Sequence, residues 1–283
     1  MTSDPTPTVT RLLKQAVRQT SCFEGATTVW HSWGSGHPLL LLHGGSGSWT
    51  HWLRNIDSLA QAGYHVIAPD IPGFGASDVA KTGGEDAPGV ITPLWHGYTS
   101  LFGAVPCTIA GFSFGAMVAV LMARSNPDLV RHLVLVAPPG LGLRSPTFPV
   151  RSWKQLTDWN DIAPIVKHNL SLQMLHRPDS LDDETLRIHA HNIDRDRMKG
   201  RKISQTLIVK DALPLIRCPV DAIYGDQDSF YLSGLSLLEG MLKAAPYFHE
   251  LAFVVECGHW VAHEDPTAFH ARICRMLNAQ QVD

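Results

Sequence analysis

Residues 105–119 read Val-Pro-Cys-Thr-Ile-Ala-Gly-Phe-Ser-Phe-Gly-Ala-Met-Val-Ala, and this stretch decides the fold. Its apolar beginning predicts a buried strand and its end predicts a helix, so Ser113 lies at the turn between them. Gly111 and Gly115 complete the pattern G-x-S-x-G, because a Cβ at either position collides with a neighbour in so sharp a bend. The bend lifts the Ser113 hydroxyl above the sheet, where the N-terminus of the helix favours negative charge.

The composition is that of an ordinary globular protein. The chain has 283 residues, 45% hydrophobic and 17% charged, enough for one large α/β domain with an insertion. Its formal net charge of −3 gives no electrostatic basis for binding nucleic acid or an anionic membrane. We find no apolar run of membrane-spanning length and no signal segment, so we expect a cytoplasmic protein. Five scattered cysteines without C-x-x-C spacing predict reduced thiols.

Buried strands alternate with helical patterns in the first half of the chain. Continuous apolar runs predict strands buried on both faces at residues 38–42, 64–69, 105–110 and 132–137, after an earlier strand at 27–33. Helical spacing follows at residues 49–62 and 92–102. This alternation predicts an α/β protein with a doubly wound, mostly parallel sheet.

The pattern changes between residues 138 and 211, which contain no strand-like run. Amphipathic helices are predicted there at residues 153–156, 162–175, 182–196 and 203–209. The alternation resumes with a strand at 218–225, a helix at 232–242, a strand at 249–255 and a helix at 266–277. We therefore predict a helical lid at 138–211, inserted into a core formed by residues 1–137 and 212–283. Asp265 is expected to cap the last helix.

Candidate partners for Ser113 follow two later strands. A serine hydroxyl attacks only when a base takes its proton, and a third group must orient that base. Asp226 and Asp228 come after the strand that ends at Gly225, and His259 comes after the strand that ends near residue 255. The chain order is therefore serine, aspartate, histidine. The residues alone leave both aspartates open, with Asp70 as a more distant third.

Five segments together resemble the α/β-hydrolase family, over nearly the whole chain from Leu39 onward. They are His43–Gly45, Asp70–Ser77, Gly111–Gly115, Gly225–Asp228 and Gly258–His259. The resemblance implies an α/β-hydrolase fold with Ser113 as nucleophile, His259 as base and, by the G-x-x-D spacing, Asp228 as orienting acid. It further implies that the backbone N–H groups of Gly45 and Phe114 form an oxyanion hole. Neither a metal nor an organic cofactor is implied.

Within that family, the lid and the turn Gly258-His259-Trp260 resemble the meta-cleavage product hydrolases, which split a carbon–carbon bond, and related carboxylesterases and lactonases. By this resemblance Arg197 is the closest match to a lid arginine that binds a substrate carboxylate; the alternative is a solvated basic helix end. Gly44, Phe112 and Trp260 are further predicted substrate contacts. Phe112 stands where those hydrolases generally carry asparagine, which suits an ester or lactone at least as well.

We therefore expect a serine hydrolase that acts through an acyl-enzyme or an equivalent mechanism. Its predicted substrate is a small organic molecule with an apolar body: a carboxylic ester, a lactone or a vinylogous carbon–carbon bond. Two alternatives on the same scaffold are a lyase of the hydroxynitrile type and a non-catalytic ligand receptor. The expected partner is a small molecule, with no nucleic acid and no membrane. The sequence leaves the oligomeric state open, a homo-oligomer included.

Overall fold

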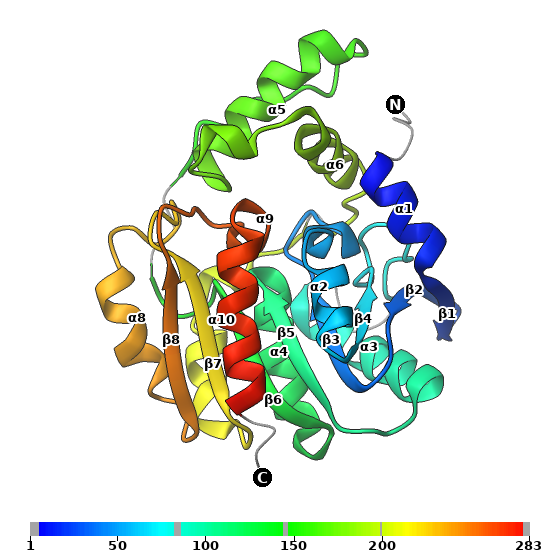
Figure 1. The fold of residues 1–283 in the computed structure, drawn as a ribbon, viewed down its shortest axis with the longest axis vertical. Coiled ribbons are helices and arrows are strands. Elements are labelled where there is room, and N and C mark those ends of the chain that lie inside the picture. Colours follow the sequence, from blue (N-terminus) through cyan, green and yellow to red (C-terminus); the bar gives the residue numbers. More distant parts are fainter. Residues whose placement is uncertain (1–5, 82–85, 144–146, 199, 280–283) are drawn as a thin grey trace.

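The computed structural model describes residues 6–81, 86–143, 147–198 and 200–279, and its centre is an eight-stranded sheet of order β1-β2-β4-β3-β5-β6-β7-β8 (Figure 1). The strands are β1 Val17–Phe23, β2 Ala26–Trp33, β3 His37–Leu42, β4 Tyr64–Pro69, β5 Cys107–Phe112, β6 Val130–Val136, β7 Val220–Gly225 and β8 Phe248–Val254. Strands β3 to β8 pair in parallel, whereas β2 is antiparallel to both β1 and β4. The predicted doubly wound, mostly parallel sheet is confirmed.

The central strands are buried because helices cover both faces of the sheet. Helices α2 (Ile56–Gln61) and α10 (Pro266–Ala279) pack together on one face, and α3 (Ala87–Phe102) and α4 (Phe114–Ser125) pack on the other (Figure 1). A strand between two helical layers has no polar face, so the side chains from Leu39 to Leu42 are all fully buried. This is why continuous apolar runs located the strands correctly.

Three local predictions are wrong. The helix predicted at 49–62 is divided into a 3₁₀ turn at Trp49–Trp52 and α2, and Asn55 between them donates a side-chain hydrogen bond to the Ala262 carbonyl at 3.0 Å. Residues 153–156 form a turn rather than a helix. Helix α1 (Pro7–Gln15) and strand β1 were not predicted, because β1 lies at the sheet edge with one buried residue and shows no apolar run. The cap at Asp265 is confirmed by a 2.9 Å bond from the Ala268 N–H.

The described residues between β6 and β7 form helices and contain no strand. They include α5 (Trp159–Gln173), α6 (Asp183–Asp194) and α7 (Ile208–Ala212), with 3₁₀ turns at Pro178–Ser180, Ile203–Gln205 and Leu213–Leu215. Figure 1 shows α5 and α6 above the edge of the sheet near α9 (Val261–Glu264), whereas α7 packs against α4. Helix α8 (Leu235–Leu242) follows β7. Across the described ranges, we find no helix that combines the length and apolar character needed to cross a bilayer.

Candidate active site

Ser113 occupies a strained turn between β5 and α4. Its φ of 50° and ψ of −115° lie in a region that residues with a Cβ rarely adopt. A Cβ on Gly111 would lie 2.4 Å from the Gly115 carbonyl oxygen, and one on Gly115 would lie 2.3 Å from the Leu42 carbonyl oxygen. The two glycines are therefore required by close backbone approach, which agrees with the steric reason inferred from the sequence. The Ser113 N–H donates to the Val136 carbonyl at 2.8 Å and anchors the turn to β6.

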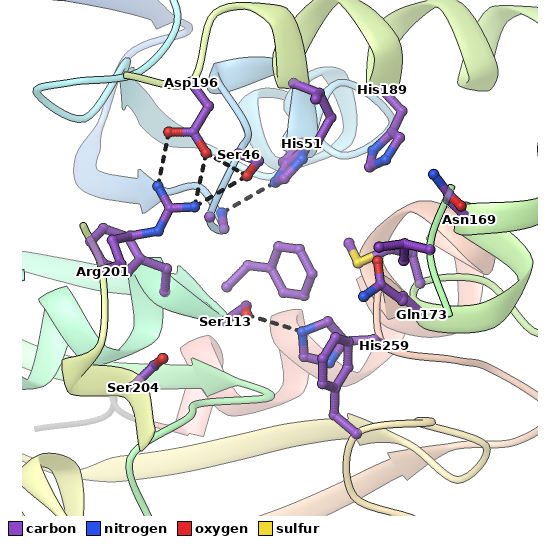
Figure 2. Close-up of a pocket in the computed structure, with 18 of the residues that line it drawn as sticks. Ser46, His51, Ser113, Asn169, Gln173, His189, Asp196, Arg201, Ser204 and His259 are labelled. Carbon is purple, nitrogen blue, oxygen red and sulfur yellow. Dashed lines mark hydrogen bonds and ion pairs between the residues drawn. The ribbon is translucent and has the colours of Figure 1, made fainter. Parts of the chain in front are cut away.

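The structure joins the side chains of Ser113, His259 and Asp228 by two successive hydrogen bonds. His259 Nε2 lies 3.0 Å from Ser113 Oγ (Figure 2). On the other side of the ring, His259 Nδ1 lies 2.7 Å from Asp228 Oδ2. Asp228 is fully buried and His259 is 3% exposed. A carboxylate beside Nδ1 favours the tautomer that carries its proton there, so Nε2 is free to accept the serine proton. The geometry is that of a general base held in place for a nucleophile.

The two other aspartates have different surroundings. Asp228 Oδ1 accepts the Phe230 N–H at 3.0 Å, which fixes the carboxylate towards His259. The backbone N–H of Asp226 instead continues the sheet by donating to Val254, and its buried Oδ1 has no partner within the described part of the chain. Asp70 accepts the backbone N–H groups of Trp49 and Ala76 at 3.0 and 2.8 Å, so it ties two loops together. Of the three, Asp228 is the one bonded to the histidine.

Gly45 and Phe114 lie beside Ser113 and line the same cavity. A Cβ built on Gly45 would lie 3.6 Å from Phe114 Cβ, so the two residues are neighbours across the cleft. Among the hydrogen bonds of the described residues, neither of their backbone N–H groups donates to a protein acceptor. Two unsatisfied N–H groups next to a nucleophile are suited to an anionic oxygen.

A cavity of about 720 Å³ opens between the sheet edge and the helical segment that joins β6 to β7, with Ser113 and His259 in its wall (Figure 2). Both Gly44 and Phe112 line it, as expected from the sequence. Its apolar lining also includes Trp153, Met174, Ile193 and Phe230. The rings of Phe112 and Phe230 pack on either side of His259, with centroids 5.1 and 4.6 Å from the imidazole. The volume suits a small organic molecule.

The structure corrects two predicted substrate contacts, Arg197 and Trp260, since neither side chain lines this cavity. Arg197 donates through Nη2 to the Gly75 carbonyl at 3.1 Å and to the Ser77 carbonyl, so it holds the loop after β4. Trp260 is fully buried, and its Nε1 donates to the His51 carbonyl at 2.9 Å. Both side chains serve the packing around the cavity.

Arg201, which the sequence reasoning did not select, lines the cavity instead. A Cβ on Gly45 would lie 3.6 Å from Arg201 Nη2, and the guanidinium lies 4.9 Å from the Phe74 ring centroid. Asp196 binds this guanidinium through two bonds of 2.9 and 2.8 Å, and Ser46 donates to Asp196 at 2.5 Å (Figure 2). Burial opposes ionisation of Asp196, but the bonds from Arg201 and Ser46 hold its pKa below the ordinary value. The arginine is therefore already neutralised by a carboxylate.

Two buried histidines, His51 and His189, also line the cavity. Burial lowers the pKa of His189 from 6.5 to about 4 and that of His51 well below 6.5, so both rings are neutral near pH 7. The Gly44 N–H donates to His51 Nδ1 at 3.2 Å, which leaves the ring proton on Nε2. His51 Nε2 and His189 Nδ1 have no partner among the described residues. No sequence pattern singles out either residue, since 15 histidines are spread along the chain.

One further cluster has metal-ligand chemistry, formed by Asp221, His249 and Glu250 near the start of β7 and β8. Asp221 is bonded to His132 at 2.7 Å and to His249 at 2.9 Å, and Glu250 pairs with Arg275. Both oxygen atoms of Asp221 and Oε1 of Glu250 are thus already bonded to protein groups. None of these residues lines the Ser113 cavity.

Known proteins match this chain over most of its length. The model of the alpha/beta hydrolase family matches residues 39–272. The chain belongs to the alpha/beta hydrolase family. The predicted family, fold and hydrolase class of enzyme are confirmed by this match together with the relatives below.

Among the relatives of this alpha/beta hydrolase is a 2-hydroxy-6-oxo-6-phenylhexa-2,4-dienoate hydrolase of Burkholderia cepacia, 29% identical over 255 residues that cover 84% of this chain and 86% of the relative. A 2-hydroxy-6-oxononadienedioate/2-hydroxy-6-oxononatrienedioate hydrolase of Paraburkholderia phymatum is 28% identical, covering 96% and 99% of the two chains. An esterase of Rhodococcus sp. has a similar fold, with a TM-score of 0.75 at 20% identity over 94% of this chain and 99% of the esterase. A meta-cleavage product hydrolase of Pseudomonas fluorescens gives a TM-score of 0.73 at 20% identity, over 92% and 97%.

Proposed function

We propose that this alpha/beta hydrolase is a serine hydrolase that cleaves small, uncharged carboxylic esters or lactones with an apolar acyl group. The observation that carries the proposal is the relay from Asp228 through His259 to Ser113, with bonds of 2.7 and 3.0 Å. The nucleophile and the base lie in the wall of a cavity whose apolar side chains, among them Trp153, Met174 and Phe230, can hold the acyl group.

The reaction proceeds in two halves. His259 takes the proton of Ser113, whose oxygen attacks the carbonyl carbon, and the N–H groups of Gly45 and Phe114 hold the resulting oxyanion. His259 then returns the proton to the leaving alcohol, which leaves an acyl group on Ser113. In the second half, His259 takes a proton from water, which attacks the acyl-enzyme; His259 then returns this proton to Ser113 Oγ as the bond to the acyl group breaks and the acid is released. Asp228 orients His259 and stabilises its cationic form throughout.

The cation beside Gly45 is paired with a carboxylate, which supports an uncharged substrate; Arg151 and Lys154 also line the cavity, and both residues are exposed. Arg201 beside Gly45 is bound by the Asp196 carboxylate through two hydrogen bonds, so a substrate carboxylate there competes with an acid that is already in position. His51 and His189 are neutral and offer hydrogen bonds without charge. Phe112, directly before the nucleophile, adds an apolar surface against His259.

A second candidate is hydrolysis of a carbon–carbon bond in a dienoate. It is supported by the names of the two curated relatives and by the presence of the Arg201 guanidinium in the cavity. In this case the substrate carboxylate displaces Asp196 and takes over the two bonds to Arg201. Ser113, His259 and the two N–H groups keep the same positions in the reaction.

A substrate panel separates the two candidates. We expect turnover of p-nitrophenyl butyrate and of a γ-lactone by the wild type and its loss in Ser113→Ala, with little change in Arg201→Gln. If the dienoate named for the Burkholderia relative is turned over faster, and Arg201→Gln but not the control Arg197→Gln abolishes that turnover, the carbon–carbon assignment replaces the ester assignment. Cyanide release from a cyanohydrin without ester turnover identifies a lyase instead. Ligand binding without any turnover identifies a receptor.

A further inference from the structure

A second cavity of about 480 Å³ lies on the other side of helix α6 from Ser113. Its lining includes Ile188, His191, Asn192 and Arg195, which follow the three- and four-residue spacing of one helix face. His189 and Ile193 on the neighbouring face, and Asp196 just beyond the helix, line the Ser113 cavity instead. The remaining walls come from α1, β1, β2 and the loops after β3 and β4. Helix α6 therefore separates two distinct cavities.

The second cavity contains more cationic side chains than its carboxylates neutralise. Arg18, Arg187 and Arg195 all line it, and Arg187 pairs with Asp183 at 2.6 Å. Within the described ranges, Arg18 and Arg195 form no ion pair with a carboxylate; Arg195 Nη1 contacts the His191 ring at 3.1 Å. The carboxylate in the lining, Asp70, already accepts two backbone N–H groups. Asp70 also interacts electrostatically with both Arg195 and Arg18, so these two guanidinium groups share one carboxylate and a net positive charge remains for an anionic ligand.

The deeper wall supplies a buried polar atom without a partner. His31 is 3% exposed and lines the cavity, and its Nδ1 has no hydrogen-bond partner among the described residues. Burial, with a smaller contribution from Arg18, lowers the pKa of His31 to about 4, so the ring is uncharged near pH 7. The nitrogen itself is enclosed by protein, so His31 contributes an uncharged ring to the wall. Val9, Trp49 and Ile188 give the same cavity an apolar lining.

We propose that this cavity is a binding site for an organic carboxylate with an apolar body, held by Arg18 and Arg195. Guanidinium groups bind carboxylates through charge-assisted hydrogen bonds, and the apolar body packs against Val9, Trp49 and Ile188. This site requires neither Ser113 nor its cavity, so it goes beyond the proposed hydrolase activity.

Calorimetric titration of the full chain with octanoate and with octanamide tests the proposal. The two probes have the same apolar chain, so they differ in the charge that the arginines recognise. We expect octanoate to bind the wild type at least tenfold more tightly than octanamide does. The double variant Arg18→Gln/Arg195→Gln is expected to abolish this preference. The matched control Arg151→Gln, which removes an arginine from the lining of the Ser113 cavity, is expected to retain it.

The single variant Arg18→Gln provides a test that remains valid if the double variant fails to fold. Arg18 is exposed on edge strand β1, so this change is expected to leave the fold intact. We expect this single change to weaken octanoate binding at least threefold with an unchanged melting temperature. Equal binding of octanoate and octanamide, no octanoate binding, or undiminished binding by folded arginine variants overturns the proposal. Ester turnover is measured separately with Ser113→Ala as control, so failure of the hydrolase assignment is distinguishable from failure of this site.

Discussion

Substitution of Gly115 by alanine has two opposing effects on stability: alanine has the higher helix propensity, but its Cβ clashes with the backbone near the turn around Ser113. Gly115 is the second residue of α4, where propensity alone predicts that alanine stabilises the helix by about 0.5–1 kcal/mol. The structure predicts the opposite. The new Cβ would lie 2.3 Å from the Leu42 oxygen and 2.5 Å from the His43 oxygen, where ordinary contacts begin at 3.4 Å.

The start of α4 must therefore move by roughly 1 Å away from the end of β3, since the obstructing atoms are backbone. Overpacking of this kind costs about 1–3 kcal/mol, which exceeds the gain in helix propensity. Because Ser113 immediately precedes α4, its hydroxyl shifts with the helix relative to His259. A displacement of about 1 Å reduces catalysis by about 100-fold.

Urea unfolding and kcat/KM for p-nitrophenyl butyrate measure both effects. Gly240→Ala is the matched control, because Gly240 also lies inside a helix, α8, and a Cβ at this position would have nothing within 4 Å. We expect the control to raise the free energy of unfolding by about 0.5–1 kcal/mol and to leave activity unchanged. A Gly115→Ala protein that is as stable and as active as the control would refute the steric argument.

Three further outcomes are expected. Asp228→Asn removes the acceptor at His259 Nδ1 and lowers kcat about 10⁴-fold without unfolding the protein; activity within tenfold of wild type contradicts this. Arg197→Gln lowers stability by about 1–3 kcal/mol in urea unfolding but leaves the ratio of anionic to neutral ester turnover unchanged, because the side chain binds backbone carbonyls. Burial lowers the pKa of His31, His43 and His189 from 6.5 to about 4, so the unfolded chain takes up protons first as pH falls. The free energy of unfolding therefore declines between pH 6.5 and 4, with these three histidines contributing at most about 4 kcal/mol per pH unit, and equal stability at pH 7 and pH 5 contradicts this.

The positions of Ser113, Asp228 and His259 follow from sequence because the fold itself brings them together. Each residue lies in the segment that follows a strand of the parallel sheet, within five residues of its end, and the carboxyl ends of parallel strands meet at one edge. Apolar runs located those strands, so the loops that follow them were located as well. Both Asp226 and Asp228 are ordinary turn residues after a strand, so the local sequence did not show which one bonds the histidine. The G-x-x-D spacing of the family was needed to choose Asp228.

The side chains between β6 and β7 are harder to predict, because the direction in which each one points depends on packing between distant segments. The stretch from Asp194 to Arg201 carries acids and bases with no hydrophobic periodicity to fix its orientation. Arg197 turns to the carbonyls of the loop after β4, whereas Arg201 enters the Ser113 cavity with Asp196. Which arginine enters the cavity is thus decided by tertiary packing and could not be predicted from the local sequence.

Fluorophosphonate labelling followed by peptide mapping tests the central claim, that the imidazole of His259 activates the hydroxyl of Ser113. We expect one label per chain, attached to Ser113, with no label in Ser113→Ala and a labelling rate at least 100-fold lower in His259→Gln, in line with the usual contribution of a general base of about 10²–10⁴. Labelling at another residue, or an equal rate in the histidine variant, would contradict the account.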